Sequence, residues 1–250
     1  MSNYLLGQGS IYVAARDANG KPKALRWLRD VSSAKIALKT SEVNHKESFS
    51  GQRATAKVIT TGKEASIDLT LMEMSGENLA MATQGKLAQV TNGSITNEVL
   101  PAGLVAGDRV ALKYPKVSAV AITDSTGTPV TLDPAKYQVN AEYGAIVLND
   151  LTGVTQPLKV AYSYAALETV AIFAEGQKET FLRYEGINLA EEGKPIIVEL
   201  YRVTAKPLKD LSLITDKLSD MNISADVLID TTKPANSDLG QFGRILQGAP

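Results

Sequence analysis

Short segments in which apolar and polar residues alternate dominate the chain, and this alternation is typical of β-strands with one buried face. It predicts strands over residues 10–15, 31–39 and 64–74 in the first part of the chain. The dipeptide Asn19-Gly20 is typical of a tight hairpin turn and makes residues 23–28 the return strand. Further strands are predicted over residues 169–174, 180–184, 195–203, 223–229 and 244–246.

Two segments interrupt this alternation. Residues 40–61 are mostly polar, and a polar stretch of this length inside a compact β domain is a functional segment, a disordered segment or a long hairpin arm. Residues 210–221 are ambiguous, because Leu211, Ile214 and Leu218 fit the spacing of a helix. In the same segment Leu211, Leu213 and Thr215 fit the spacing of a strand.

One short helix is expected after residue 74. Ser75 is a good N-cap, and Glu77 lies in the first turn, where the helix dipole favours a negative charge. Gly85 stands where a left-handed residue commonly ends a helix. A helix of two to three turns is marginal alone, so we expect it to pack against a sheet.

Residues 101–165 have the pattern of a separate module. The module opens with Pro101-Ala102-Gly103, and its short strands are separated by turns at residues 124–129 and 133–134. Strands of this length with turns at this spacing predict a small β-sandwich or barrel. We therefore expect a mainly β fold: a discontinuous β domain of residues 1–100 and 166–250 with an inserted β domain at 101–165.

Composition narrows the class of protein. A hydrophobic content of 44% and a charged content of 21% are enough for a buried core. The net charge of −1 lacks the basic excess that is typical of proteins that grip nucleic acid. The chain has no cysteine, which excludes disulfides and thiolate metal sites. The first ten residues resemble no secretory signal, and no apolar run reaches membrane-spanning length, so we expect synthesis in a cytoplasm.

The residues offer little for catalysis. His45 is the one histidine, and it lies in the polar stretch without an evident partner for a triad or a metal site. Glu191-Glu192 is flanked by glycine and proline, as in a turn, and Asp124 begins a turn that lacks the acidic positions of a calcium loop. We therefore expect no enzymatic activity, no metal and no cofactor.

Several segments resemble the major tail tube proteins of long-tailed bacteriophages of the siphovirus type. In the inserted module these are ITDSTGTPV at 122–130, YQVN at 137–140, EYG at 142–144 and VAYSY at 160–164. The flanks also resemble that family, through residues 65–74, the helix after Ser75, residues 195–203, SADVLID at 224–230 and FGRI at 242–245. The resemblance covers most of the chain, but its motifs are turn-and-strand patterns rather than chemical signatures.

The resemblance implies a β-sandwich or half-barrel of the tail-tube type, flanked by one short helix. It implies that six copies close into a ring and that rings stack into a hollow tube in the virion tail, through which genomic DNA passes without specific binding. The partners it implies are further copies of the chain, the tape measure protein, tail assembly chaperones and the tail terminator. The inserted domain would lie on the tube exterior.

On this interpretation we expect acidic side chains to line the lumen and repel phosphates, with Asp68, Glu199 and Asp226 as candidates. Residues 40–61 are the candidate inter-ring arm, disordered in the monomer and ordered on stacking. The arm candidates are Glu42, His45, Lys46, Glu47, Arg53 and Lys57.

Two other classes of protein compete with this interpretation. A baseplate component or another tail ring protein shares the expected fold and differs in its copy number. A monomeric immunoglobulin-like or carbohydrate-binding module needs a site lined by aromatic residues, and no cluster of aromatic residues is evident in the sequence.

Overall fold

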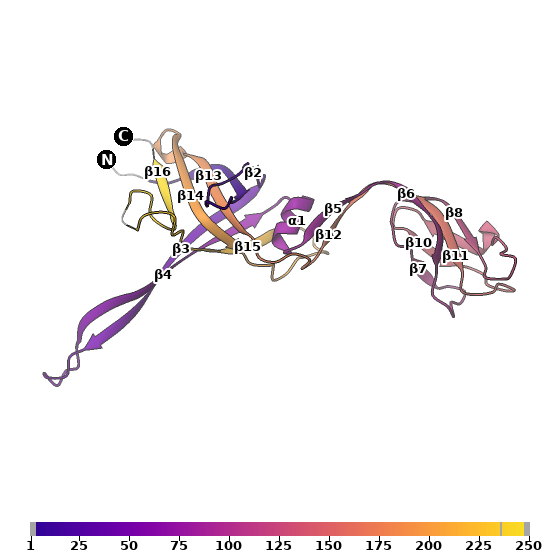
Figure 1. The fold of residues 1–250 in the computed structure, drawn as a ribbon, viewed down its shortest axis with the longest axis horizontal. Coiled ribbons are helices and arrows are strands. Elements are labelled where there is room, and N and C mark those ends of the chain that lie inside the picture. The colour runs from indigo at the N-terminus through magenta and orange to yellow at the C-terminus, as the bar shows by residue number, and fades with distance from the viewer. Residues whose placement is uncertain (1–3, 236, 248–250) are drawn as a thin grey trace. The chain divides into compact units, whose positions relative to one another are not determined.

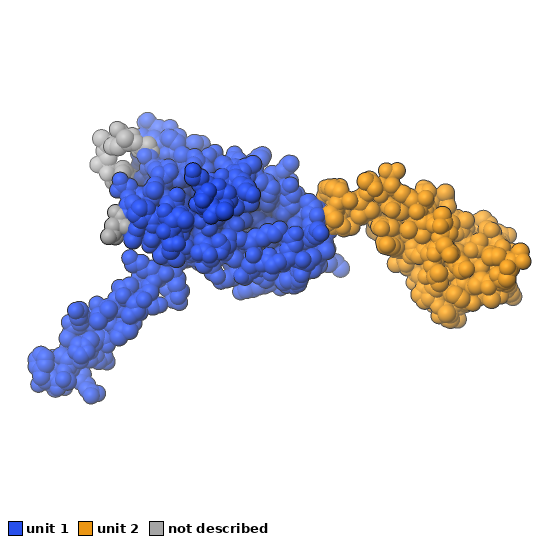
Figure 2. All heavy atoms as spheres, in the orientation of Figure 1, with its two compact units in different colours: residues 1–87, 170–250 blue, residues 88–169 orange. Residues whose placement is uncertain are grey.

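The computed structural model describes residues 4–235 and 237–247 and divides the chain into two units (Figures 1 and 2). Unit 1 combines the part up to residue 87 with the part from residue 170, and unit 2 is residues 88–169. The inserted domain was predicted over residues 101–165, but unit 2 extends beyond these bounds at both ends. The reason is that β6 (Gly93–Val99) pairs with β11 (Lys159–Tyr164) and therefore belongs to the inserted unit.

The described residues are mainly β, as the alternation predicted. Unit 1 holds an eight-stranded antiparallel sheet in the order β2-β1-β13-β14-β15-β4-β3, with β16 also paired to β14. Its strands are β1 (Gly7–Ala15), β2 (Arg26–Trp27), β3 (Val31–Lys46), β4 (Thr55–Leu71), β13 (Glu179–Asn188), β14 (Lys194–Ala205), β15 (Met221–Val227) and β16 (Gly243–Gln247).

The core of unit 1 covers one face of this sheet. Where β4 pairs antiparallel with β15, from Ala65 to Leu71, every second residue of both strands is buried, and the intervening residues face the other side. The buried set in these two strands is Ala65, Ile67, Leu69, Leu71, Met221, Ile223, Ala225 and Val227.

The sheet curves into an open half-barrel. Strands β1, β3, β4, β13, β14 and β16 all contribute residues to one cavity of about 620 Å³ on the core side of the sheet. At one end β2 covers the outer side of β1, and the Leu28 amide, just after β2, donates to the Ile11 carbonyl at 2.8 Å. Among the described strands β1 and β3 do not pair, so the barrel is open between them.

Helix α1 (Gly76–Ala82) begins where the sequence predicted it. Ser75 caps it by accepting a hydrogen bond from the Asn78 amide at 3.3 Å. The prediction that Gly85 is the left-handed residue at the helix end was wrong, because Gln84 has the positive φ, 48°. Gly85 has a different role, since a Cβ there would lie 2.7 Å from the Ala171 carbonyl oxygen.

Two further segments differ from prediction. Residues 210–220 form neither the helix nor the strand that their spacing allowed, and β15 starts only at Met221. The strand predicted over residues 10–15 begins earlier, because Gly7 and Gly9 lie inside β1. A Cβ at Gly9 would lie 2.3 Å from the Glu185 carbonyl oxygen, so glycine permits the close approach of β1 and β13.

The chain passes between the units through a two-stranded antiparallel ribbon. This ribbon consists of β5 (Lys86–Val90) and β12 (Leu167–Ala171). The remaining short helical turns are η1 (Pro134–Lys136) in unit 2 and η2 (Leu189–Glu191) in unit 1, which is followed by Glu192 in a left-handed turn.

Unit 2 is a small β module with two three-stranded antiparallel sheets, β7-β10-β9 and β6-β11-β8. Both sheets contribute to one core, in which Ile122, Ile146 and Val160 are completely buried. Asp124 organises the predicted turn by accepting a hydrogen bond from the Val130 amide at 2.8 Å. The strands not yet bounded are β7 (Arg109–Ala111), β8 (Val117–Thr123), β9 (Tyr137–Asn140) and β10 (Ala145–Leu148).

Candidate functional site

The long edge of the unit 1 sheet is the first feature that can meet another molecule. Strand β3 pairs with β4 on one side and is last in the sheet order, so its other side presents unpaired backbone groups. Its core-facing side chains are also uncovered: Leu38 is 80% exposed, and Ile36 is exposed as well. A free edge with apolar side chains favours pairing with another strand.

Residues 40–61 form the distal part of the β3–β4 hairpin, which we call the arm (Figure 1). Strand β15 pairs with β4 only from Ala65 to Leu71, so the earlier part of β4 has β3 as its one partner. About ten residues of paired strand therefore extend beyond the sheet, roughly 30 Å at 3.3 Å per residue. All six arm candidates lie on this hairpin, from Glu42 to Lys57.

The expectation that the arm is disordered in the monomer is not what the structure shows. Antiparallel pairing continues along it, with Val43 opposite Ile59 and Asn44 opposite Val58. The pairing shifts register after Ser41 and again after His45. The apolar cross-strand pair Val43–Ile59 stabilises a hairpin whose composition is mostly polar.

The tip of the arm is organised by one carboxylate. Glu47 accepts hydrogen bonds from the amides of Phe49 and Ser50, both at 2.9 Å, and from the Ser50 hydroxyl. The hydroxyl bond, together with the amide bonds, lowers the pKa of Glu47 to about 2. The tip thus holds a fixed turn that presents Phe49 to solvent, 89% exposed.

The three lumen candidates share one face of the sheet, opposite the core. Asp226 lies opposite Ser66 in the β15–β4 register, two residues from Asp68. Asp68 accepts a hydrogen bond from the Ser224 hydroxyl at 2.6 Å, and Lys206 pairs with Asp226 at 2.6 Å. Both carboxylates therefore have partners on their own face.

Glu199 is not the free carboxylate that a repelling wall requires. It is only 7% exposed, and it lies between Arg183 on β13 and Arg244 on β16, with 2.6 Å to the Arg244 Nε. The hydrogen bond to Glu199 raises the pKa of the Arg244 guanidinium. Glu199 links three strands, and its place on the lumen stays a prediction.

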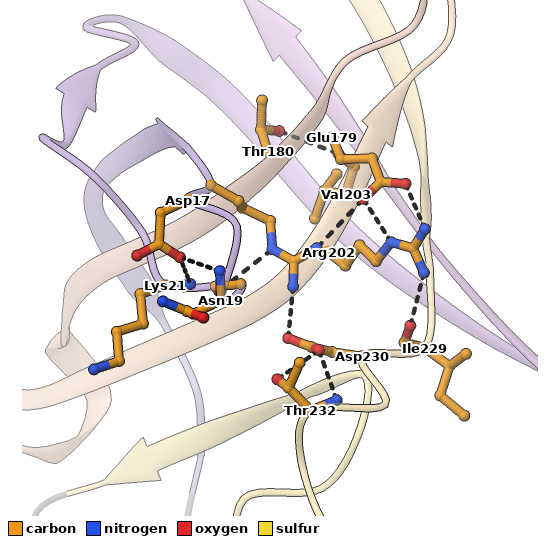
Figure 3. Close-up of polar contacts among 12 residues, drawn as sticks. Asp17, Asn19, Lys21, Glu179, Thr180, Arg202, Val203, Ile229, Asp230 and Thr232 are labelled. Atoms are coloured by element: carbon orange, nitrogen blue, oxygen red, sulfur yellow. Dashed lines mark hydrogen bonds and ion pairs between the residues drawn. The ribbon is translucent and has the colours of Figure 1, made fainter.

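This face carries a second cluster of ion pairs, which no local pattern in the sequence predicted. Glu179 binds the guanidinium of Arg202 and that of Arg16, and Arg16 also pairs with the buried Asp230 at 2.8 Å (Figure 3). Burial opposes ionisation of Asp230, but hydrogen bonds from Thr232 and the nearby cations outweigh it, and the pKa of Asp230 is lowered. This cluster ties β1, β13, β14 and the segment after β15 together.

The described ranges, 4–235 and 237–247, contain no group of three or more His, Asp or Glu side chains placed to hold a metal ion. Within the same ranges, no helix has the length and apolar character needed to cross a membrane.

Comparison with known proteins gives a family but no activity. No curated protein is similar enough to the chain to match it. A family model matches residues 4–246, which include both units and the arm. The chain therefore belongs to the family described as Protein of unknown function UCP028589.

Proposed function

We propose that this chain is a structural protein that assembles with copies of itself, as the tail tube protein of a long-tailed bacteriophage. Copies close into hexameric rings, and the rings stack into a hollow tube in the virion tail through which DNA passes. The observation that carries the proposal is β3, a 16-residue edge strand with free backbone groups and exposed apolar side chains. Pairing such edges around a ring removes the cost of leaving them open.

The arm supports stacking of the rings. It extends beyond the sheet, and its ordered tip carries an exposed aromatic side chain. In the proposed tube it contacts the next ring, while unit 2 lies on the exterior. The resemblance to tail tube proteins also implies other partners. We propose these as the tape measure protein, the tail assembly chaperones and the tail terminator.

A direct test uses analytical ultracentrifugation and negative-stain microscopy of the purified protein at rising concentration. We expect hexameric rings or tubes with a central hole. Leu38→Lys places a charge on the apolar face of the edge strand and should abolish them. Ala37→Lys, one residue away on the opposite face of the same strand, is the matched control and should leave assembly intact.

The arm has its own test. Deletion of residues 43–58 should prevent tube growth and leave a folded protein, because among the described strands these residues pair only within the hairpin. Tubes of normal length from this deletion would reject the role of the arm. A wild-type protein that stays monomeric at every concentration would contradict the whole proposal and favour the monomeric binding module.

Rings that never stack, present in few copies per particle, would favour the alternative of a baseplate or other tail ring component.

A further inference from the structure

The opening of the half-barrel is an apolar groove that nothing in the described residues fills. Its lining residues come from β1 and β3 on its two sides and from β4, β13, β14 and β16 between them, and none carries a charge. Ile11, Ile67 and Val198 contribute to the floor, while Ile36 and Ile245 at the rim are exposed. A cavity of about 620 Å³ with this lining has room for several aliphatic side chains.

The groove is bordered by backbone as well as by side chains. The outer side of β1 is paired with β2 only at Tyr12 and Val13, so Gly7 to Ser10 have a free edge. Across the opening, β3 is unpaired on its outer side. An apolar floor between two free strand edges is suited to an extended segment that forms main-chain hydrogen bonds and inserts alternate side chains.

The same chain carries an apolar segment with no cover. In residues 209–220, which we call the aliphatic loop, Ile214 is 98% exposed, Leu218 is 86% and Leu213 is 85%. Ile214 is the most exposed large apolar side chain in the part of the chain that the structure describes. Exposed aliphatic side chains gathered in one short segment mark a protein interaction surface.

The two ends of the aliphatic loop are fixed while its middle is free. At its start the Leu208 amide donates to the Ala82 carbonyl at 2.8 Å, and at its end Met221 is completely buried. Leu211 also packs against the core, so residues 212–220 are free to extend, and they reach at most about 15 Å at 3.3 Å per residue out and back. The alternation of Leu211, Leu213 and Thr215 also allows the loop to become a strand.

We infer that the aliphatic loop of one copy inserts into the uncharged groove of a second copy and pairs there with a free strand edge. The residues that the structure describes leave both the loop and the groove uncovered. The net charge of −1 gives little repulsion between copies. Because loop and groove are different surfaces, the contact is head to tail, and such contacts build rings or filaments. The inference rests on the proposed function, for which it supplies one contact between neighbouring copies.

The test uses cysteines placed in a chain that has none. One preparation carries Ile214→Cys in the loop and a second carries Ile245→Cys at the groove rim, and the two are mixed and oxidised. We expect the mixed disulfide at least 10-fold above the yield with a Val105→Cys partner. Val105 lies in unit 2 and is a matched control, since it is 61% exposed and Ile245 is 62% exposed.

Three outcomes separate this inference from the proposed function. Rings without the preferred mixed disulfide leave the function standing and overturn the loop–groove contact. Preferential cross-linking of Phe49→Cys to Ile245→Cys also overturns it, because the arm tip would then occupy the groove. The preferred disulfide in a protein that forms no rings supports the contact and contradicts the tube.

A double variant tests the contact without cysteines. Leu213→Asp with Ile214→Asp should weaken self-association about 100-fold, because two charges would enter an uncharged groove. The midpoint of thermal unfolding should not change, since both side chains are exposed in the isolated chain. Unchanged self-association would contradict the inference.

Discussion

The two units of this chain differ in how completely they cover their apolar cores. Unit 2 covers its core from both sides with two three-stranded sheets, and five of its core side chains are completely buried. Unit 1 has a larger sheet, yet it leaves a long strand edge, an apolar groove and an aliphatic loop uncovered. On the proposed function, unit 1 keeps this apolar surface for contacts between copies, whereas unit 2 closes its own core.

The largest effect is expected in the core of unit 2. Ile146 lies on the central strand of its sheet and is completely buried, so Ile146→Ala should reduce the free energy of unfolding of unit 2 by about 2–5 kcal/mol. Hydrogen exchange read separately for the two units would show faster exchange in unit 2 and unchanged exchange in β4 and β15. Equal loosening of both units would show that they do not fold independently.

A smaller loss is expected at the ion pairs that join β13, β14 and β16. Glu199→Ala leaves Arg183 and Arg244 without their common partner, although both arginines keep some access to water. The expected loss in the free energy of unfolding is about 2 kcal/mol, measured by urea denaturation. Glu199→Gln retains one of the two accepting oxygens and should lose less. An equal loss would assign the effect to the charge.

Removal of the helix cap should reduce the free energy of unfolding by a smaller amount. Ser75→Ala removes the oxygen that accepts the Asn78 amide and should cost about 1 kcal/mol in the free energy of unfolding of unit 1. Ser75→Asp, which can still cap, is the control and should retain most of the stability. A Ser75→Ala protein as stable as the wild type would mean that packing alone holds α1.

A substitution on the uncovered edge of β3 should hardly change the stability of the isolated chain. Leu38→Ala should change the free energy of unfolding of the dilute protein by less than about 0.5 kcal/mol, because Leu38 is exposed. The same variant should reduce assembly at high concentration, as seen by sedimentation. A large loss of stability in the dilute protein would show that Leu38 already packs within the monomer, against this account.

The arm tip should respond to acid without unfolding the units. The pKa of Glu47 is lowered from its ordinary value of 4.5 to about 2, so its contribution is complete above about pH 4.5 and is lost as the pH falls through about 2. The protection of the Phe49 and Ser50 amides, relative to intrinsic exchange at the same pH, should therefore fall in that range. In Glu47→Gln protection should already be low at neutral pH, and the fall should be absent.

Local signals in the sequence predicted much of the fold. Period-two alternation placed most strands of unit 1, and Ser75 marked the start of α1, since caps and alternation depend on near neighbours. The structure of residues 210–220 was not predicted. Their aliphatic residues fit the spacing of a helix and of a strand, and the segment forms neither.

The candidate site was harder to predict. The sequence indicated the arm through its polar composition, but the pairing of Glu199 depends on arginines 16 and 45 residues away, which no local pattern connects. The free edge of β3 depends on the order of strands in the sheet. That order is set by contacts between distant segments, so alternation along one strand does not reveal it.

Hydrogen exchange along β3 tests the central claim most directly, because it reports whether the free edge finds a partner strand. The outward-facing amides of Val31–Lys46 should exchange quickly in the dilute protein and become protected at concentrations where copies assemble, while the amides of unit 2 stay unchanged. Particles that form while the β3 amides stay unprotected would contradict assembly through this edge.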